Sequence, residues 1–161
     1  MRASYILFQA NLALLVLVLL PAAAWSQVGH YPLLAHADLP LYPGIARALH
    51  LTGTVQIRIT VAKGEVVGAK VESVTIESHN GGPLSDDGKK KIGLLLSTPS
   101  LANIKGWHFE HDADATFTIK FVYRIAGKET ALPENPHVKF DLPVVTVTAA
   151  PFKPTVSYGS S

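Results

Sequence analysis

Apolar and polar residues alternate along three stretches of the chain. From Thr54 to Ala62 every second side chain is aliphatic, which is the period of a strand with one buried face. Ala115 to Ile125 repeats this pattern with aromatic and β-branched residues, and Val66 to Ile76 alternates less regularly. The pattern therefore predicts three strands, with Lys63-Gly64-Glu65 as the hairpin turn between the first two.

Two further segments have a helical period. Pro43 is suited to the first position of a short helix, which Gly53 is expected to end by taking a positive φ. Ser85 is typical of a helix N-cap, and the two acidic residues after it favour the positive end of the helix dipole. This second helix is expected to run to Leu96 and to restart at Thr98-Pro99.

The order helix, hairpin, helix and strand predicts an α+β fold. We expect a small antiparallel three-stranded sheet with two helices on one face, in a compact domain over residues 42–125. Residues 27–41 are expected to be a short linker. Residues 126–161 are rich in proline and are expected to form an extended tail, with an edge strand at 144–148.

The N-terminus has the three-part pattern of a secretory signal peptide. Arg2 supplies the positive charge, an unbroken apolar run extends from Leu12 to Leu20, and small residues follow. Residues 1–26 are predicted to be cleaved after Ser26, with Ala24 as the second choice. The alternative is an uncleaved N-terminal anchor, although polar residues interrupt the apolar length that a span needs. In both cases we expect a periplasmic or secreted protein.

Composition excludes several classes of function. The formal charge of +2 argues against a strongly basic nucleic-acid binder. Because the chain has no cysteine, it has no disulfide, thiol nucleophile or iron–sulfur cluster, and an exported domain without disulfides must rely on its apolar core. No nucleophile–base arrangement and no Gly-rich phosphate loop stands out. We therefore predict that the protein is not an enzyme and uses no cofactor.

Potential metal ligands gather before the last predicted strand. They are His108, Glu110, His111, Asp112 and Asp114. Zinc and copper sites use such side chains, but two histidines three residues apart on a strand lie on opposite faces. We interpret the group as a solvated loop without a metal site. The run Lys89-Lys90-Lys91 is likewise interpreted as a solvated helix face.

The order of these elements and several of their short sequence motifs resemble the C-terminal domain of TonB, the periplasmic energy transducer. The matching residues are Tyr42-Pro43, Leu51-Thr52-Gly53-Thr54-Val55, Gly64, Trp107-His108-Phe109 and Thr116-Phe117-Thr118-Ile119-Lys120-Phe121. The resemblance implies the α+β fold and a mode of binding. In that family a short receptor segment, the TonB box, is added as a strand to the edge of the sheet.

The chain departs from full transducers at its N-terminal side. Their anchor carries a functional histidine and is followed by a long Pro-rich spacer, whereas the apolar segment from Tyr5 to Ala24 has no histidine. About 15 residues from Gln27 precede the domain, and fully extended they would reach roughly 50 Å. In addition, Glu110-His111 stands where the family has a proline. The resemblance therefore does not imply energy transduction.

The last predicted strand is the expected binding edge. The residues assigned to this peptide-binding edge strand are Thr116, Thr118, Lys120, Val122 and Arg124. The alternative is a strand that serves only core packing. Because open edges are usually either used or blocked, the backbone border of this strand is our candidate site.

The tail contains a segment similar to a TonB box, with an acidic residue, β-branched residues and then Thr-Ala. Its box-like residues are Val144, Val145, Thr146, Val147 and Thr148. We hypothesise that this segment pairs with an edge of the protein's own sheet or with a neighbouring copy. The alternatives are an ordinary extra strand and an unstructured tail.

The sequence thus predicts a periplasmic TonB-C-like protein-binding module, linked to outer-membrane transport. Its expected partner is an outer-membrane receptor or another envelope protein, with self-association as a further form of pairing. We expect no nucleic-acid partner, and membrane contact only through an uncleaved N-terminal segment. The alternatives are a structural envelope protein whose sheet is capped by its own tail, and a His-based metal-binding accessory protein.

Overall fold

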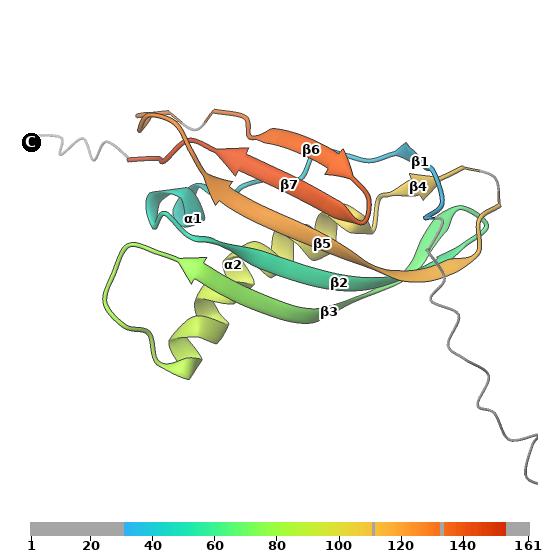
Figure 1. Ribbon diagram of the computed structural model, residues 1–161, viewed down its shortest axis with the longest axis horizontal. Helices are drawn as coiled ribbons and strands as arrows, with labels where there is room; N and C mark the ends of the chain where they lie inside the picture. The colour runs from blue at the N-terminus through green and yellow to red at the C-terminus, as the bar shows by residue number, and fades with distance from the viewer. Residues whose placement is uncertain (1–30, 111, 133, 154–161) are drawn as a thin grey trace, which may run out of the picture. The chain divides into compact units, whose positions relative to one another are not determined.

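The computed structural model describes residues 31–110, 112–132 and 134–153. The strands are β1 (Leu34–His36), β2 (Thr52–Ala62), β3 (Glu65–Ser78), β4 (His108–Phe109), β5 (Ala115–Ile125), β6 (His137–Asp141) and β7 (Val144–Ala149). The helices are α1 (Gly44–Ala48) and α2 (Asp86–Ile104). The strands form one 7-stranded sheet in the order β1-β4-β3-β2-β5-β7-β6, which curls strongly into half a barrel (Figure 1).

This sheet corrects the predicted fold class. The expected α+β fold, with three antiparallel strands and two helices on one face, is wrong because the fold is mostly β and only α2 is a substantial helix. The predicted strands are present as β2, β3 and β5. The expected linker and tail add β1, β6 and β7 to the same sheet, and β5 pairs parallel with β7, so the sheet is mixed.

The tail enters the sheet because its alternating residues complete the core. Val145, Val147 and Ala149 are buried and face the same side of β7. Burying such side chains contributes about 1.5–3 kcal/mol each for the valines, which a free tail would forgo. By contrast, β1 and β4 have 3 and 2 residues and are too short to show a strand period in the sequence.

Two predicted helix ends also differ from those in the structure. Gly53 lies in β2 and not at the end of α1, and a Cβ at this position would collide with the backbone carbonyl of Thr75. His50 takes the positive φ of 50° in the turn after α1. The restart expected at Pro99 is wrong because α2 continues through this residue. The N-cap is confirmed, since the Gly88 N–H donates to Ser85 Oγ at 3.2 Å.

The core fills the concave face of the sheet, against α2. Trp107 is fully buried, and its ring centroid lies 6.4 Å from Phe109, 5.9 Å from Phe121 and 5.7 Å from Phe140. Phe140 belongs to the outermost strand β6, whereas Phe109 belongs to β4 near the opposite margin. The curl therefore brings both margins of the sheet onto one aromatic cluster.

A buried arginine fastens the tail. Arg47 of α1 is 1% exposed. Its Nε donates to the carbonyl oxygen of Ala150 at 2.9 Å, and its Nη1 donates to that of Glu134 at 2.8 Å. The guanidinium carbon lies 5.9 Å from the centroid of the Phe152 ring. Arg47 thus holds the chain on both sides of the β6–β7 hairpin.

Two tyrosines face each other in the core. The Tyr42 hydroxyl donates to the carbonyl oxygen of Leu51, and the Tyr123 hydroxyl lies 2.8 Å from Ser100 Oγ. Their rings meet edge to face with centroids 5.1 Å apart. Burial raises the pKa of Tyr123 to about 12, and burial together with the neighbouring Tyr123 raises the pKa of Tyr42 as well.

The predicted signal peptide, residues 1–26, lies outside the described residues. Within the part of the chain that the structure describes, no helix has both the length and the apolar character needed to cross a membrane.

Candidate functional site

One long flank of the sheet is not covered by a strand. β3 pairs with β2 from Glu65 to Ser78, but on its other side β4 reaches it only at the pair Glu65 and His108. Among the described residues, no strand pairs with the outer side of β3 between Val66 and Ser78. This outer flank is the candidate site.

The register shows which backbone groups face this flank. The Lys120 N–H donates to the Pro143 carbonyl at 2.8 Å, so the backbone of Lys120 faces β7. The backbone N–H and C=O groups of successive residues point to opposite sides of a strand. Those of Phe121 therefore point to β2, where Phe121 is paired with Val55. The backbone groups of Val55 accordingly point to β5, and those of its neighbour Thr54 point to β3.

The same alternation continues into β3. Thr54 is paired with Thr75, whose carbonyl crowds Gly53 of β2 and therefore points inward. The backbone N–H and C=O groups of Val74 and Ile76, the neighbours of Thr75, then point away from β2. The register is regular over this stretch, since its shifts lie on either side of it.

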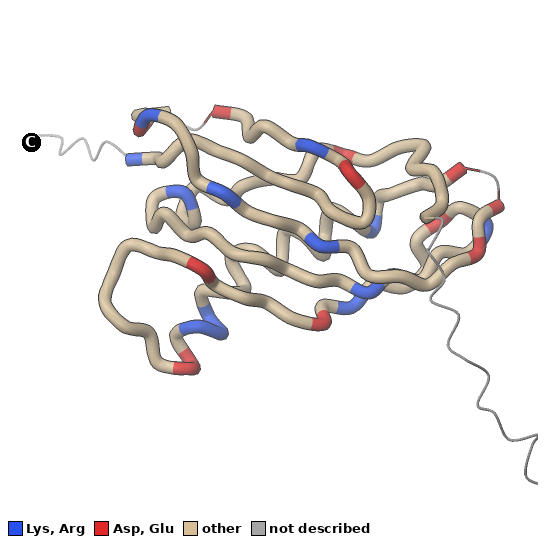
Figure 2. The backbone as a smooth tube through the Cα atoms, in the orientation of Figure 1, with Lys and Arg blue, Asp and Glu red and all other residues tan. Residues whose placement is uncertain are grey.

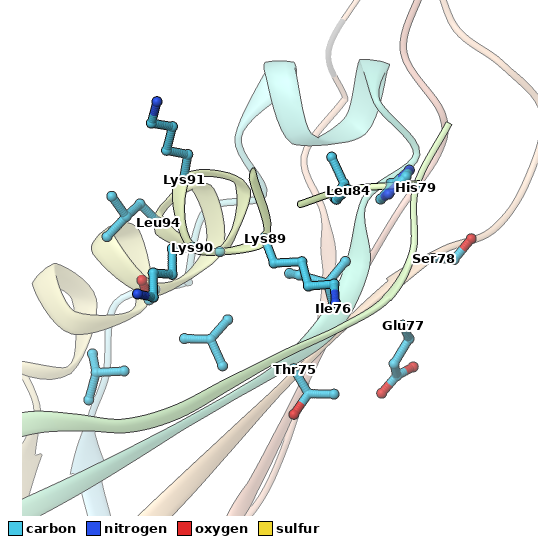
Figure 3. A pocket seen from close by; sticks show the side chains of 14 residues that line it. Thr75, Ile76, Glu77, Ser78, His79, Leu84, Lys89, Lys90, Lys91 and Leu94 are labelled. Carbon is cyan, nitrogen blue, oxygen red and sulfur yellow. The ribbon is translucent and has the colours of Figure 1, made fainter. Parts of the chain in front are cut away.

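A groove of about 1020 Å³ follows this flank, between β3 and the N-terminal half of α2 (Figure 3). Its aliphatic lining consists of Val71, Val74, Ile76, Leu84 and Leu94. Its polar lining consists of Thr75, Glu77, Ser78, His79, Lys89, Lys90, Lys91 and Ser97. We call it the β3–α2 groove.

The groove exists because α2 crosses β3 closely and then passes beyond it. A Cβ at Gly93 would lie 3.2 Å from Val74 Cγ1, so the helix approaches the strand closely at a position that has no side chain. The first turns of α2 extend past the β3 flank (Figure 1). The helix therefore forms a wall beside the outward backbone groups.

The wall is positively charged. Lys89 pairs with Asp86 at 3.3 Å, whereas Lys90 and Lys91 form no ion pair with any described residue. Figure 2 shows the basic and acidic segments side by side at the start of α2. Glu77, the carboxylate in the lining, accepts a hydrogen bond from Thr54 Oγ1 at 3.1 Å. The lining of the groove thus contains three lysines and one glutamate, and the glutamate is already engaged in a hydrogen bond.

A buried polar atom also borders the groove. Nδ1 of His79 is shielded from solvent and finds no hydrogen-bond partner among the described residues. Such atoms are uncommon in folded proteins, because an unmade buried hydrogen bond costs about 1–3 kcal/mol. His79 therefore adds a polar group to the end of the groove where β3 leads into residues 79–85.

The predicted binding strand occupies a different position from the one expected. β5 pairs with β2 over residues 115–123 and with β7 over residues 120–125, so it is central and the expectation of a free edge is wrong. The assigned residues lie along this paired strand, and they are Thr116, Thr118, Lys120, Val122 and Arg124. Their backbone border is closed by the chain itself from Lys120 to Arg124.

The box-like residues lie in β7, next to β5 of the same chain. Val145 and Val147 are buried, while Val144, Thr146 and Thr148 are half-buried. Of the two pairings weighed for this segment, the structure has the one with the protein's own sheet. Its likeness to a TonB box stays a prediction.

The histidine-rich loop does not assemble a ligand group in the structure. His108 Nδ1 lies 2.9 Å from Glu65 Oε1, and Asp114 Oδ1 accepts the Lys63 N–H at 3.0 Å. His111 lies outside the described residues. Over residues 31–110, 112–132 and 134–153, no three or more potential ligands come together around a common point.

Sequence reasoning missed the β3–α2 groove for identifiable reasons. Every residue except proline carries the same N–H, so the outward donors of Val74 and Ile76 leave no mark in the side-chain pattern. The available signal was the lysine run followed by Gly93, because a buried glycine within a helix often marks a close approach.

Comparison of the chain with protein-family models, with curated proteins and with solved structures found no match.

Proposed function

We propose that the protein is a non-enzymatic binding module that captures an extended segment of another protein by adding it to β3. The observation that carries this proposal is the outer flank from Val66 to Ser78, which no described strand covers. Strand addition uses such a flank, since its N–H and C=O groups are already aligned for pairing. The regular stretch around Val74 and Ile76 supplies the pairing groups.

The β3–α2 groove supplies side-chain contacts for the same segment. Leu94 is 60% exposed and lines the groove together with Val74 and Ile76. In an added strand alternate side chains would face this apolar wall, while the others would face solvent. Backbone bonds would give affinity and the wall would select the residues that face it.

The proposed setting is the periplasm or the extracellular side. The N-terminal sequence has the signal-peptide pattern, so the proposed partner is an outer-membrane receptor or another envelope protein. Energy transduction is not part of the proposal. The linkage to outer-membrane transport rests on the resemblance of residues alone.

Amide exchange measured by NMR tests strand addition directly. The probe is an acetylated, amidated octapeptide, Thr-Asn-Thr-Val-Thr-Val-Thr-Gly, called the neutral probe. Without probe, the Val74 and Ile76 amides should exchange faster than those of Ser73 and Thr75, because they face outward. At millimolar probe the two outward amides should become protected. Protection confined to β1 or β6, or no change at β3, would refute the proposal.

A matched pair of variants at one position separates backbone from side-chain effects. Ile76→Pro deletes an outward N–H but leaves the donors that face β2, so it should abolish probe binding. Ile76→Ala removes the same aliphatic side chain but keeps the donor, so it should retain binding with reduced affinity. Equal binding by both variants would contradict strand addition. Circular dichroism of each variant checks that the sheet is retained.

A second candidate function is a structural protein that assembles through its own sheet. The covering of β5 by β7 favours self-capping, but β3 remains uncapped, so assembly would require pairing with another copy. This candidate predicts a concentration-dependent dimer in analytical ultracentrifugation that the neutral probe dissociates. A monomer at millimolar concentration that binds the probe would favour capture of a different protein.

A further inference from the structure

We infer, on the basis of the proposed strand addition, that the captured segment is acidic, with a carboxylate two positions from an aliphatic residue and both side chains facing α2. The carboxylate would lie beside Lys90 and the aliphatic side chain beside Leu94.

The geometry of α2 places these two residues together. Lys90 and Leu94 are four positions apart and therefore share one helix face. The neighbouring row, Gly93 and Ser97, is buried against the sheet. The face with Lys90 and Leu94 thus borders the groove beyond β3, where an added strand would lie.

The spacing of a strand matches this face. One turn of helix advances about 5.4 Å, while side chains two apart on a strand are separated by roughly 6.6–6.8 Å. A captured segment that runs along this face with position i near Lys90 would therefore place residue i+2 near Leu94. Both side chains point to the helix, because alternate residues of a strand share a face.

The charged residues around the groove determine which side chain is favoured at position i of the captured segment. Lys90 has no carboxylate partner among the described residues, whereas the neighbouring Lys89 already pairs with Asp86. On the opposite side of an added strand, side chains would meet Thr75 and Glu77, which are exposed members of β3. Glu77 disfavours a carboxylate on that side, so acidic residues are confined to the positions that face α2.

Lys91 provides the matched control for Lys90. The two residues carry the same charge and are adjacent in α2. In Figure 3 the Lys90 side chain extends on the β3 side of the helix, whereas that of Lys91 extends away from β3. Replacing either lysine with glutamine changes the net charge equally, so a difference between the variants reports position and not overall charge.

The experiment compares two probes against three proteins by NMR titration at low and high salt. The acidic probe is Thr-Asp-Thr-Val-Thr-Val-Thr-Gly, which differs from the neutral probe only in Asp for Asn. For the wild-type protein we expect the acidic probe to bind roughly two- to fivefold more tightly, as for an exposed ion pair. Lys90→Gln should remove this preference, Lys91→Gln should largely keep it, and 0.5 M salt should weaken it.

The outcomes separate this inference from the function on which it rests. Equal affinity of the two probes, with Val74 and Ile76 still protected, overturns the acidic partner and leaves strand addition standing. Equal loss of preference in Lys90→Gln and Lys91→Gln overturns the positional assignment. If neither probe protects β3 at millimolar concentration, the proposed function itself falls.

Discussion

The two flanks of the central strands β2 and β5 differ in how far further strands cover them. On the β5 side, the tail adds β7 and β6, so that a parallel and then an antiparallel partner cover the strand. On the β3 side, the chain adds one short contact at Glu65 and then leaves the strand unpaired to Ser78. The same sheet therefore has a closed flank and an open flank.

The closed flank is held by buried groups. Val145 and Val147 are fully buried, and Arg47 donates to two backbone carbonyls beside the β6–β7 hairpin. The open flank is instead bordered by a helix with a lysine-rich, partly apolar wall. Exposed side chains such as Leu94 contribute little to folding there.

This difference separates stability from recognition within one sheet. Unpaired strand edges invite unwanted pairing, and natural proteins usually block them. Two register shifts in β3 limit its regular stretch, which restricts what can pair with it. We infer that the closed flank maintains the fold and that the open flank is free to bind.

The largest expected effect concerns Arg47 on the closed flank. Arg47→Met keeps the apolar stem but leaves the carbonyls of Ala150 and Glu134 without their donors. We expect a loss of about 4 kcal/mol in the free energy of unfolding, since two partly buried hydrogen bonds, each worth about 1–3 kcal/mol, and the contact of the guanidinium with the Phe152 ring are lost. Urea denaturation measures this loss. The control is Arg58→Met, because Arg58 is an exposed arginine paired with Glu72 and should cost less than about 1 kcal/mol.

Alkaline pH should weaken the core beside the closed flank. Burial raises the pKa of Tyr123 to about 12, from 10.0, so folding favours the protonated hydroxyl. That stabilisation is fully present below pH 10 and is lost as pH rises through about 12. The loss is about 3 kcal/mol, from roughly 1.4 kcal/mol per pKa unit.

Urea denaturation at a series of pH values from 8 to 12 measures this slope. The Tyr123→Phe variant has no hydroxyl to ionise at this position, so its stability should decline less over the same window. A decline as steep as that of the wild-type protein would assign the alkaline loss to other groups.

A smaller loss of stability is expected for a substitution where β2 pairs with β3. In Gly53→Ala the new Cβ would collide with the Thr75 carbonyl, which must move for the chain to fold. We expect a loss of about 2 kcal/mol in the free energy of unfolding, as is usual for overpacking. Gly82→Ala is the control, because a Cβ there meets no atom within 4 Å. Similar stability of both variants would show that β3 moves at little cost to accommodate the new Cβ.

The sequence predicted the parts of this fold that have a side-chain period. Alternation located β2 and β5, and Ser85 correctly marked the start of α2. Strand order has no such signature, so the last strand of the compact region was taken for an edge although Val144–Ala149 covers it. The groove was missed because its pairing groups belong to the backbone, and because a lysine run looks the same on a solvated face and beside a binding site.

The smallest expected effect on stability, and the sharpest test of the open flank, is Leu94→Asp. Leu94 is 60% exposed, so the free energy of unfolding should fall by less than about 1 kcal/mol, mainly through the lower helix propensity of aspartate within α2. Affinity for the neutral probe should nevertheless fall, because the apolar wall beside the added strand is lost. Leu132→Asp is the control, since Leu132 is 76% exposed and lies outside the groove lining. If both aspartate variants bind the neutral probe as the wild-type protein does, α2 does not contact the captured segment. If Leu94→Asp instead lowers stability as much as Gly53→Ala, the open flank also maintains the fold, and the separation between the two flanks is wrong.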